Sequence, residues 1–519
     1  MNNYIDVSKA LKEMTIEEKV AQMLYFAFHG TTFNSDLEYL TKELNVGGII
    51  HFARNIVSPE QVIELNLNIQ KNSKIPAFIG IDQEGGIVQR IIDGVTPFPG
   101  AMAVSASGES CYELTKAVGK DLRNMNYNMV FAPDADVNNN PLNPVINVRS
   151  YSDDPYKVSK YVNDAWRGFN DSLVIPTIKH FPGHGDTSVD SHIALPSVAK
   201  PKEELEKIEL VPFKENIKNG VPGIMVSHVL YKAFDEKYPA TLSKKILNDY
   251  LKEELKYEGL IISDSLTMGA IQENFGTREI IKQSCNAGLD LLMFCGKAGI
   301  EEEKNVFNTF TELVKNGEIS IDRINYSVKK ILEYKNKYCF GLVYKYQEPS
   351  KEAIDLGTKI SINSITKVKG NDLLPIKKDD KALIVFPKIK LFSLVENEDE
   401  SYATLGSILN KHGYSFKEII IDEELLDIDA IKNIQKEYDK IIFATYNIRE
   451  GDFQTKVYDV LDKNKLIAIS LRSPYDIKYL PNVLNYICIY EPTKLALNSL
   501  ALNIIGKENF KGKLPIKLF

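Results

Sequence analysis

Eight short apolar runs alternate with amphipathic segments over the first two-thirds of the chain. The runs are nearly continuous in Val, Ile and Phe, which is typical of strands that are buried on both faces. Eight such βα units predict a (β/α)₈ TIM barrel, although an open doubly wound sheet is built from the same alternation. We favour the barrel because a separate second pattern follows the eight units. The apolar runs are residues 23–28, 46–52, 77–81, 128–132, 175–180, 223–227, 260–263 and 289–294.

Helical patterns lie between these runs, and two sequence signals mark where helices begin. Residues 59–71 and 154–172 have the clearest amphipathic period. Thr15 and Glu18 have the spacing of a capping box ahead of the first run. Further helices are predicted at 205–218, 243–256 and 301–315.

The pattern changes near residue 345, where a polar segment that contains proline predicts a linker. A second βα rhythm follows, which predicts a smaller doubly wound, sandwich-like α/β domain. This part has no GxGxxG sequence and no P-loop, so nucleotide binding is not supported. We therefore predict a catalytic barrel at 1–344, a linker at 345–351 and a C-terminal domain at 352–519. Its predicted strands are 382–386, 418–421, 440–444, 465–469 and 484–489, and its predicted helices are 402–411, 430–438 and 453–462.

Charge and composition exclude several classes of partner. The chain has 63 Lys and Arg residues against 70 Asp and Glu residues, a formal net charge of −7, so we expect no nucleic-acid partner. No stretch of 18 apolar residues is present, so we expect no membrane span. The five cysteines form no CxxC pair, and no signal peptide is visible at the N-terminus. These features predict a cytoplasmic protein, although a secreted protein whose leader had been removed would look the same.

Polar residues follow most of the predicted strands, and a barrel has its active site at the carboxyl ends of its strands. Asp264 follows the seventh run. It has two open interpretations, a cap of the next helix or a nucleophile held ionised in a cleft. The other polar residues at strand ends are Asp82, Glu84, Arg90, Asp134, Asp136, Arg149, Lys179, His180 and His228.

The segment KHFPGHGDTSVDSH, residues 179–192, is the richest in chemistry. It contains three of the seven histidines, His180, His184 and His192, together with Asp186 and Asp190. A loop whose histidines only cap backbone groups is one interpretation, and a zinc or transition-metal site is another. The spacing matches no HExxH, HxH or cysteine-based metal site, so we expect no metal and no cofactor.

Three segments together resemble the signature sequences of family 3 glycoside hydrolases. They are IGIDQEGGIVQR at 79–90, KHFPGHGDTSVDSH at 179–192 and ISDSLTMGAI at 262–271, and NFKGKLPIKL at 509–518 resembles the end of that family's chains. The resemblance is strongest to the bacterial β-N-acetylglucosaminidases of peptidoglycan turnover and cell-wall recycling. It implies a TIM barrel followed by an α/β domain, in agreement with the pattern above.

The resemblance also implies a role for particular residues. Asp264 falls on the catalytic nucleophile, His192 on the acid/base and Asp190 on the carboxylate that pairs with it. The positions that bind the non-reducing sugar are matched by Asp82, Arg90, Arg149, Lys179 and His180. The implied enzyme is a retaining exo-β-N-acetylglucosaminidase, a β-N-acetylhexosaminidase acting on saccharides or muropeptides that contain N-acetylglucosamine, as a monomer or homodimer.

Other functions stay open at this point. A histidine acid/base would not repel phosphate, so a β-N-acetylglucosaminide phosphorylase is one alternative. Hydrolysis assisted by the substrate's acetamido group, metal-dependent hydrolysis and a catalytically dead sugar-binding protein are others. The residues do not rank a muropeptide above a chitin fragment as the aglycone, and they assign no role to the C-terminal domain.

Overall fold

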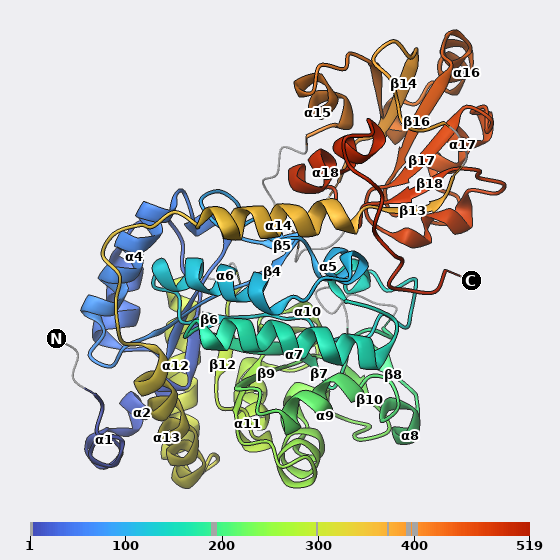
Figure 1. Ribbon diagram of the computed structural model, residues 1–519. Coiled ribbons are helices and arrows are strands. Elements are labelled where there is room, and N and C mark those ends of the chain that lie inside the picture. The colour runs from blue at the N-terminus through green and yellow to red at the C-terminus, as the bar shows by residue number, and fades with distance from the viewer. Residues whose placement is uncertain are drawn as a thin grey trace.

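The computed structural model describes residues 4–187, 195–296, 299–370, 373–390, 396 and 403–518. Figure 1 shows two parts, a large barrel surrounded by helices and a smaller sheet domain that follows it in the chain.

Eight parallel strands form the predicted barrel. Each strand pairs with its neighbours in chain order, and the last strand pairs with the first. A parallel bridge between Ile262 and Leu291 joins the seventh strand to the eighth and closes the barrel. All eight predicted runs are therefore confirmed as strands, which are β1 (Leu24–Phe26), β2 (Gly48–His51), β3 (Phe78–Ile81), β6 (Met129–Val130), β7 (Ile175–Phe181), β9 (Gly223–Val226), β11 (Leu260–Ser263) and β12 (Leu292–Phe294).

Helices cover the outside of the barrel, and their limits follow from local sequence. In the predicted capping box, the Glu18 N–H donates to Thr15 Oγ1 (3.2 Å) and the Thr15 N–H donates to Glu18 Oε2 (3.0 Å). The helix predicted at 205–218 is instead two short helices, because Pro212 lies in the first turn of the second and cannot continue a helix from before it. The main helices are α1 (Val7–Glu13), α2 (Ile16–Gln22), α3 (Ser35–Glu38), η1 (Tyr39–Glu43), α4 (Pro59–Asn72), α5 (Ala101–Ser107), α6 (Tyr112–Asn124), α7 (Pro155–Asp171), α8 (Lys202–Leu205), α9 (Val211–Lys218), η5 (Lys245–Glu254), α10 (Gly269–Gln272), α11 (Thr277–Ala287), α12 (Ile300–Lys315) and α13 (Ile321–Tyr338).

The second domain is a six-stranded sheet with the order β13-β18-β17-β16-β14-β15. The five strands predicted from the sequence are all present and parallel: β14 (Ala382–Pro387), β15 (Lys417–Ile421), β16 (Lys440–Thr445), β17 (Leu466–Ser470) and β18 (Tyr486–Cys488). The sequence did not predict the sixth, β13 (Thr366–Lys369), which pairs antiparallel with β18. The helices are α14 (Lys351–Ser364), α15 (Leu405–Lys411), α16 (Ile428–Ile434), α17 (Phe453–Val460) and α18 (Lys494–Ile504).

Hydrophobic side chains cover both faces of this sheet, and one face is continuous with the barrel. On one face, residues of β14, β16 and β17 pack with α15 and α18. On the other face, Met102, Ala103 and Ala106 of α5 join the core of the second domain. The C-terminal segment then returns to the barrel (Figure 1), where the Lys517 N–H donates to Asp153 Oδ2 at 2.8 Å. The two domains are thus packed together, while the boundaries at 344 and 352 stay a prediction.

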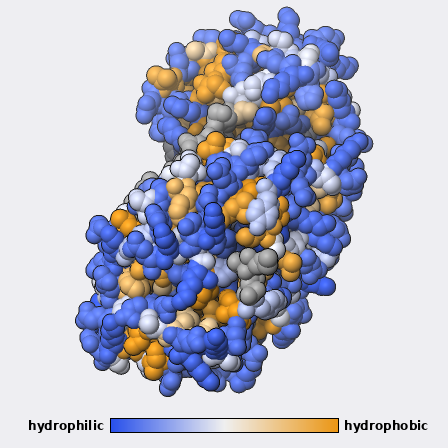
Figure 2. Space-filling model, turned by 90° about the vertical axis from the view of Figure 1, so that its left-hand side faces the viewer, coloured by the Kyte–Doolittle hydropathy of each residue, from blue (hydrophilic) through white to orange (hydrophobic). Residues whose placement is uncertain are grey.

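The outer surface in Figure 2 is mostly hydrophilic, with hydrophobic residues in small separate groups. Among the helices within the described residues, none combines the length and the apolar composition that crossing a membrane needs.

Candidate active site

A cavity of about 330 Å³ opens at the carboxyl ends of the barrel strands. Every predicted site residue that the structure describes lines it: Asp82, Arg90, Arg149, Lys179, His180 and Asp264. These residues come from four different strand ends, so the barrel brings together side chains up to 182 positions apart in the sequence. We call this space the barrel cavity.

Asp82 follows β3 and lies between two cationic side chains. Its Oδ1 is 2.9 Å from Lys179 Nζ, and its Oδ2 is 3.5 Å from Arg90 Nη2. All three side chains are largely buried, with exposed fractions of 14%, 3% and 7% respectively. These charges therefore fix one another in place at the cavity wall, and they offer donors and acceptors to a polar ligand.

Glu84 binds Arg149 and shares Lys179 with Asp82, although it was not among the residues predicted to bind sugar. It lies in β4 (Gln83–Gly85), which forms a hairpin with β5 (Val88–Gln89). Arg149 donates to both oxygens of Glu84, from Nε at 2.9 Å and from Nη2 at 2.8 Å, and Lys179 Nζ is 2.6 Å from Oε1. Burial alone would raise the pKa of Glu84, but Arg149 and Lys179 lower it, so this carboxylate is ionised at neutral pH.

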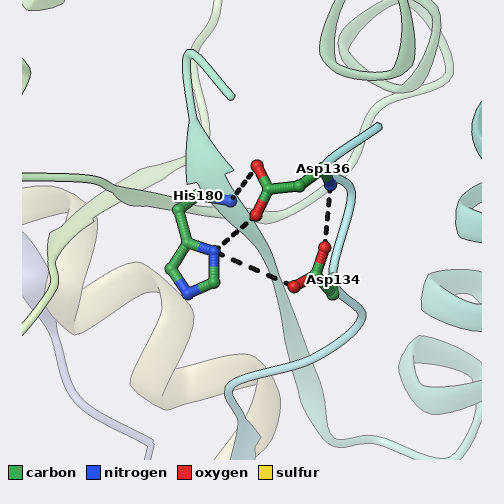
Figure 3. Close-up of side chains that lie close together, drawn as sticks. All are labelled: Asp134, Asp136 and His180. Carbon is green, nitrogen blue, oxygen red and sulfur yellow. Dashed lines mark hydrogen bonds and ion pairs between the residues drawn. The ribbon is translucent and has the colours of Figure 1, made fainter. Parts of the chain in front are cut away.

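His180, Asp136 and Asp134 form a compact buried group at the ends of β7 and β6 (Figure 3). His180 Nδ1 is 2.7 Å from Asp136 Oδ2, and its Nε2 is 3.5 Å from Arg149 Nη2. Because Arg149 can only donate, this geometry fits a neutral imidazole with its proton on Nδ1. Asp136 is therefore the residue that orients His180. Its importance could not be read from the sequence, where it was only one of several polar residues at strand ends.

The same three residues have the geometry of a possible metal cluster, because their ligand atoms lie within 4.8 Å of one another. Asp136 is already an acceptor for the N–H groups of His180 (3.2 Å) and His184 (2.6 Å). Burial and the adjacent Asp136 raise the pKa of Asp134, which favours a proton on Asp134, whereas His180 and His184 lower the pKa of Asp136. These hydrogen bonds, together with a proton on Asp134, explain why the two carboxyl groups lie close together. The group of three residues therefore serves to hold His180 in position.

Asp264 directly follows β11 and is partly exposed to the barrel cavity. Its N–H donates to the Val226 carbonyl (3.1 Å), and its Oδ1 accepts from the Ser265 N–H (2.7 Å). His228, buried at the end of β9, places Nε2 at 2.8 Å from the Ser265 carbonyl oxygen. The turn that carries Asp264 is therefore held by backbone hydrogen bonds and by the His228 side chain, and Asp264 lines the barrel cavity.

His192 and Asp190 lie outside the described residues, so their roles stay predictions. The segment leading to them is described as far as Thr187. Asn143 fastens this part of the loop, because its Nδ2 donates to the carbonyls of His184 (2.8 Å) and Gly185 (3.0 Å). His184 itself lines the barrel cavity, and burial lowers its pKa to about 4.

The sequence also did not predict two further residues of the cavity wall. Arg54 follows β2 and lies over the Phe52 ring, with 4.4 Å between its guanidinium carbon and the ring centroid. Cys295 follows β12, and burial raises the pKa of its thiol to about 12. Their position directly after predicted strands was the one signal that could have identified them.

Comparison with known proteins places this site in a family. The family model described as the glycosyl hydrolase family 3 N terminal domain matches residues 15–334. The solved structure of a glycoside hydrolase family 3 beta-N-acetylglucosaminidase from Paenibacillus sp. str. FPU-7 is 36% identical in sequence. It superimposes with a TM-score of 0.90 over 97% of this chain and 99% of that chain.

Two relatives known from sequence agree. Beta-hexosaminidase A of Pseudoalteromonas piscicida is 28% identical, over 94% of this chain and 91% of that protein. A beta-hexosaminidase of Alkalilimnicola ehrlichii is 33% identical, over 52% of this chain and 80% of that protein. With a family model that covers more than half of its length and a solved relative that matches both of its domains, the chain belongs to family 3 of the glycosyl hydrolases and is a glycoside hydrolase.

Proposed function

We propose that the chain is a retaining exo-β-N-acetylglucosaminidase, which removes terminal non-reducing N-acetylglucosamine from peptidoglycan fragments. The names of its relatives support the sugar, since they are described as a beta-N-acetylglucosaminidase and as beta-hexosaminidases. The observation that carries the proposal is that Asp264 lines the same cavity as all five residues predicted to bind sugar. At about 330 Å³ the cavity is near the small end of ligand pockets, roughly 300–1,000 Å³, as one terminal sugar requires.

In this proposal the charged residues of the wall hold the sugar by its hydroxyl groups. Asp82 supplies carboxylate acceptors, while Lys179, Arg90 and Arg149 supply donors. His180 Nε2 faces Arg149 and can accept a hydrogen bond, because its proton is held on Nδ1 by Asp136. Such fixed donors and acceptors orient the anomeric carbon toward Asp264. They reduce the entropic cost of bringing the two reacting atoms together.

The chemistry proceeds in two displacements. The Asp264 carboxylate attacks the anomeric carbon, and the bond to the leaving oxygen breaks as that oxygen receives a proton. This gives a glycosyl ester on Asp264. A water molecule then gives up a proton and attacks the same carbon, which releases the sugar and restores the carboxylate.

We assign the proton transfers to His192, with Asp190 accepting a hydrogen bond from its ring. An imidazole has an ordinary pKa near 6.5, which suits both donation and acceptance near neutral pH. His184 is less suitable, because its pKa of about 4 leaves it neutral at pH 7. His192 is five positions beyond Thr187, and five residues span at most about 17 Å, which limits how far His192 lies from the described part of the loop.

The test compares aryl N-acetyl-β-glucosaminide with aryl β-glucoside, and we expect kcat/KM to favour the former strongly. A fluorinated N-acetylglucosaminyl inactivator should leave a covalent adduct on Asp264, which peptide mapping by mass spectrometry would locate. Preference for the glucoside would refute the sugar assignment, and inactivation without an adduct on Asp264 would refute the nucleophile. Release of N-acetylglucosamine 1-phosphate in phosphate buffer would establish a phosphorylase instead.

We also propose a cytoplasmic location, which the cysteines support. All five are buried and free of disulfide bonds, as is usual in reducing compartments. Measurement of enzyme activity in cell fractions would test this location.

A further inference from the structure

A second cavity, of about 310 Å³, lies between the barrel and the C-terminal domain. The barrel side is the loop after β6. The other side is formed by the residues that directly follow β16 and β17. Open parallel sheets bind their ligands outside the carboxyl ends of their strands. This interdomain cavity is therefore at the edge of the sheet where a ligand site is expected. Its described lining residues are Asn140, Pro141, Leu142, Asn143, Asn147, Asn447, Ile448, Arg449, Ser473, Tyr475, Lys478 and Tyr479.

Two asparagines, one from each domain, line this cavity, and each has one buried side-chain amide atom without a partner among the described residues. Asn147 is 7% exposed, and its Oδ1 has no hydrogen-bond partner among the described residues. Nδ2 of Asn447 is likewise buried without a described partner. Both residues have left-handed backbone, with φ of 40° and 50°. Buried polar atoms normally have partners, so one acceptor and one donor without them, on two residues that line one cavity, match a ligand that itself carries an amide.

The cationic and aromatic residues of the interdomain cavity indicate a second property of its ligand. Arg449 and Lys478 line the cavity, and none of its described lining residues is acidic. Tyr475 presents a ring there, 5.1 Å from Lys478 Nζ, and Tyr479 presents another. We propose that the interdomain cavity is a second ligand site, which binds a small molecule that carries both an amide and a carboxylate. An N-acylated amino acid or a short acidic peptide has this chemistry.

The interdomain cavity shares a wall with the barrel cavity. In the segment 143–149, Asn143 and Asn147 line the interdomain cavity, whereas Val145 and Arg149 line the barrel cavity. The ligand can therefore be free in solution, or it can be the peptide part of a substrate whose sugar is in the barrel cavity. The second source rests on the proposed function, and the first does not.

The direct test is calorimetric titration of the full chain with N-acetyl-alanyl-glutamate, and with the same dipeptide amidated at its carboxyl groups. We expect saturable binding of the acid and weaker binding of the amide. Asn447→Gly removes the amide but tolerates φ of 50°, and Lys478→Glu reverses one charge. Each should weaken binding by about tenfold, the usual effect of losing one hydrogen bond or ion pair to a charged ligand.

Matched controls separate this site from general effects. Asn482→Gly replaces an exposed left-handed asparagine of the same domain, and Lys432→Glu reverses an exposed charge on α16. Both controls should bind the dipeptide as the wild type does. No saturable binding to the wild type, or equal weakening in the controls, would overturn the proposal.

A kinetic arm identifies the source of the ligand. Disaccharide substrates with and without an acidic peptide on the aglycone sugar are compared in the wild type and in Asn447→Gly. A higher kcat/KM for the peptide-bearing substrate, lost in the variant, supports a substrate peptide. Equal values, together with calorimetric binding, support a free ligand. Turnover of aryl N-acetyl-β-glucosaminide tests the proposed function separately, because the titration requires no catalysis.

Discussion

Glu84 is the carboxylate on which the charge balance of the barrel cavity depends, and Glu84→Gln tests this directly. The variant keeps the shape of the side chain but removes its charge. Arg149 makes two hydrogen bonds to the carboxylate and Lys179 approaches it at 2.6 Å. The amide of the variant has only one oxygen acceptor, so its NH₂ group points toward Arg149 or Lys179, which are themselves donors. Breaking a buried ion pair costs about 3–5 kcal/mol, so we expect a loss of about 4 kcal/mol in the free energy of unfolding.

This loss can be measured as a change in melting temperature. At roughly 2.1 cal/mol/K per residue, unfolding a barrel of roughly 330 residues has an entropy of about 0.7 kcal/mol/K, so 4 kcal/mol lowers Tm by about 6 °C. Differential scanning calorimetry at pH 7 gives this value. The effect also has a predicted pH dependence. The pKa of Glu84 is lowered from its ordinary 4.5, so its stabilisation is complete above that pH and is lost as the pH falls toward the folded-state pKa.

The control is Glu301→Gln, which removes a surface partner of Lys304. That pair is 2.7 Å apart, but the side chain of Glu301 is 82% exposed, so its loss should cost less than about 1 kcal/mol. Two results would refute the reasoning. One is a Tm for Glu84→Gln within a degree of the control, and the other is a deficit that stays constant when the pH is lowered below 4.5.

Four further predictions concern catalysis. Asp264→Asn should lower kcat by about 10³-fold or more, because it removes the proposed nucleophile; near-normal turnover in steady-state assays would exclude that role. Asp136→Asn should lower kcat/KM by about 10- to 100-fold, because it removes a charge-assisted hydrogen bond that orients His180; the change should appear mainly in KM, and an unchanged KM would argue against this positioning role. His192→Ala should slow substrates with poor leaving groups by about 10²–10⁴-fold and aryl glycosides much less, so equal losses would exclude an acid. Dialysis against a chelator should leave activity unchanged, and loss of activity restored by a divalent metal would favour the metal-dependent alternative.

The architecture could be predicted where neighbouring residues in the sequence determine it. The barrel strands are buried on both faces, so they appear in the sequence as continuous apolar runs, and all eight were predicted. The strand β13 was missed because its sequence, TKVK, has two lysines and is partly exposed. The hairpin of β4 and β5 was missed as well. It is very short, and its turn depends on Gly85 and Gly86, which adopt φ of 95° and 59°.

The site was predictable to the extent that strand order determines it. Asp82 and Asp264 follow predicted strands and Lys179 lies near the end of one, and closure of a barrel brings such positions to one end. Which of these groups pair with one another could not be predicted. Glu84 accepts from Arg149, 65 positions away, and Asp136 accepts from His180, 44 positions away. These pairings depend on side-chain geometry, which a spacing pattern does not contain.

The C-terminal domain is part of the structure that shapes the site, as one contact makes clear. Glu491, from the end of the second sheet, accepts the Gly100 N–H through Oε2 at 2.7 Å. A Cβ on Gly86 would lie 2.4 Å from that same oxygen, so the glycine permits this approach. Gly86 lies in the hairpin that carries Glu84, and Glu84 in turn holds Arg149 at the barrel cavity. The second domain therefore supports the cavity wall through the hairpin.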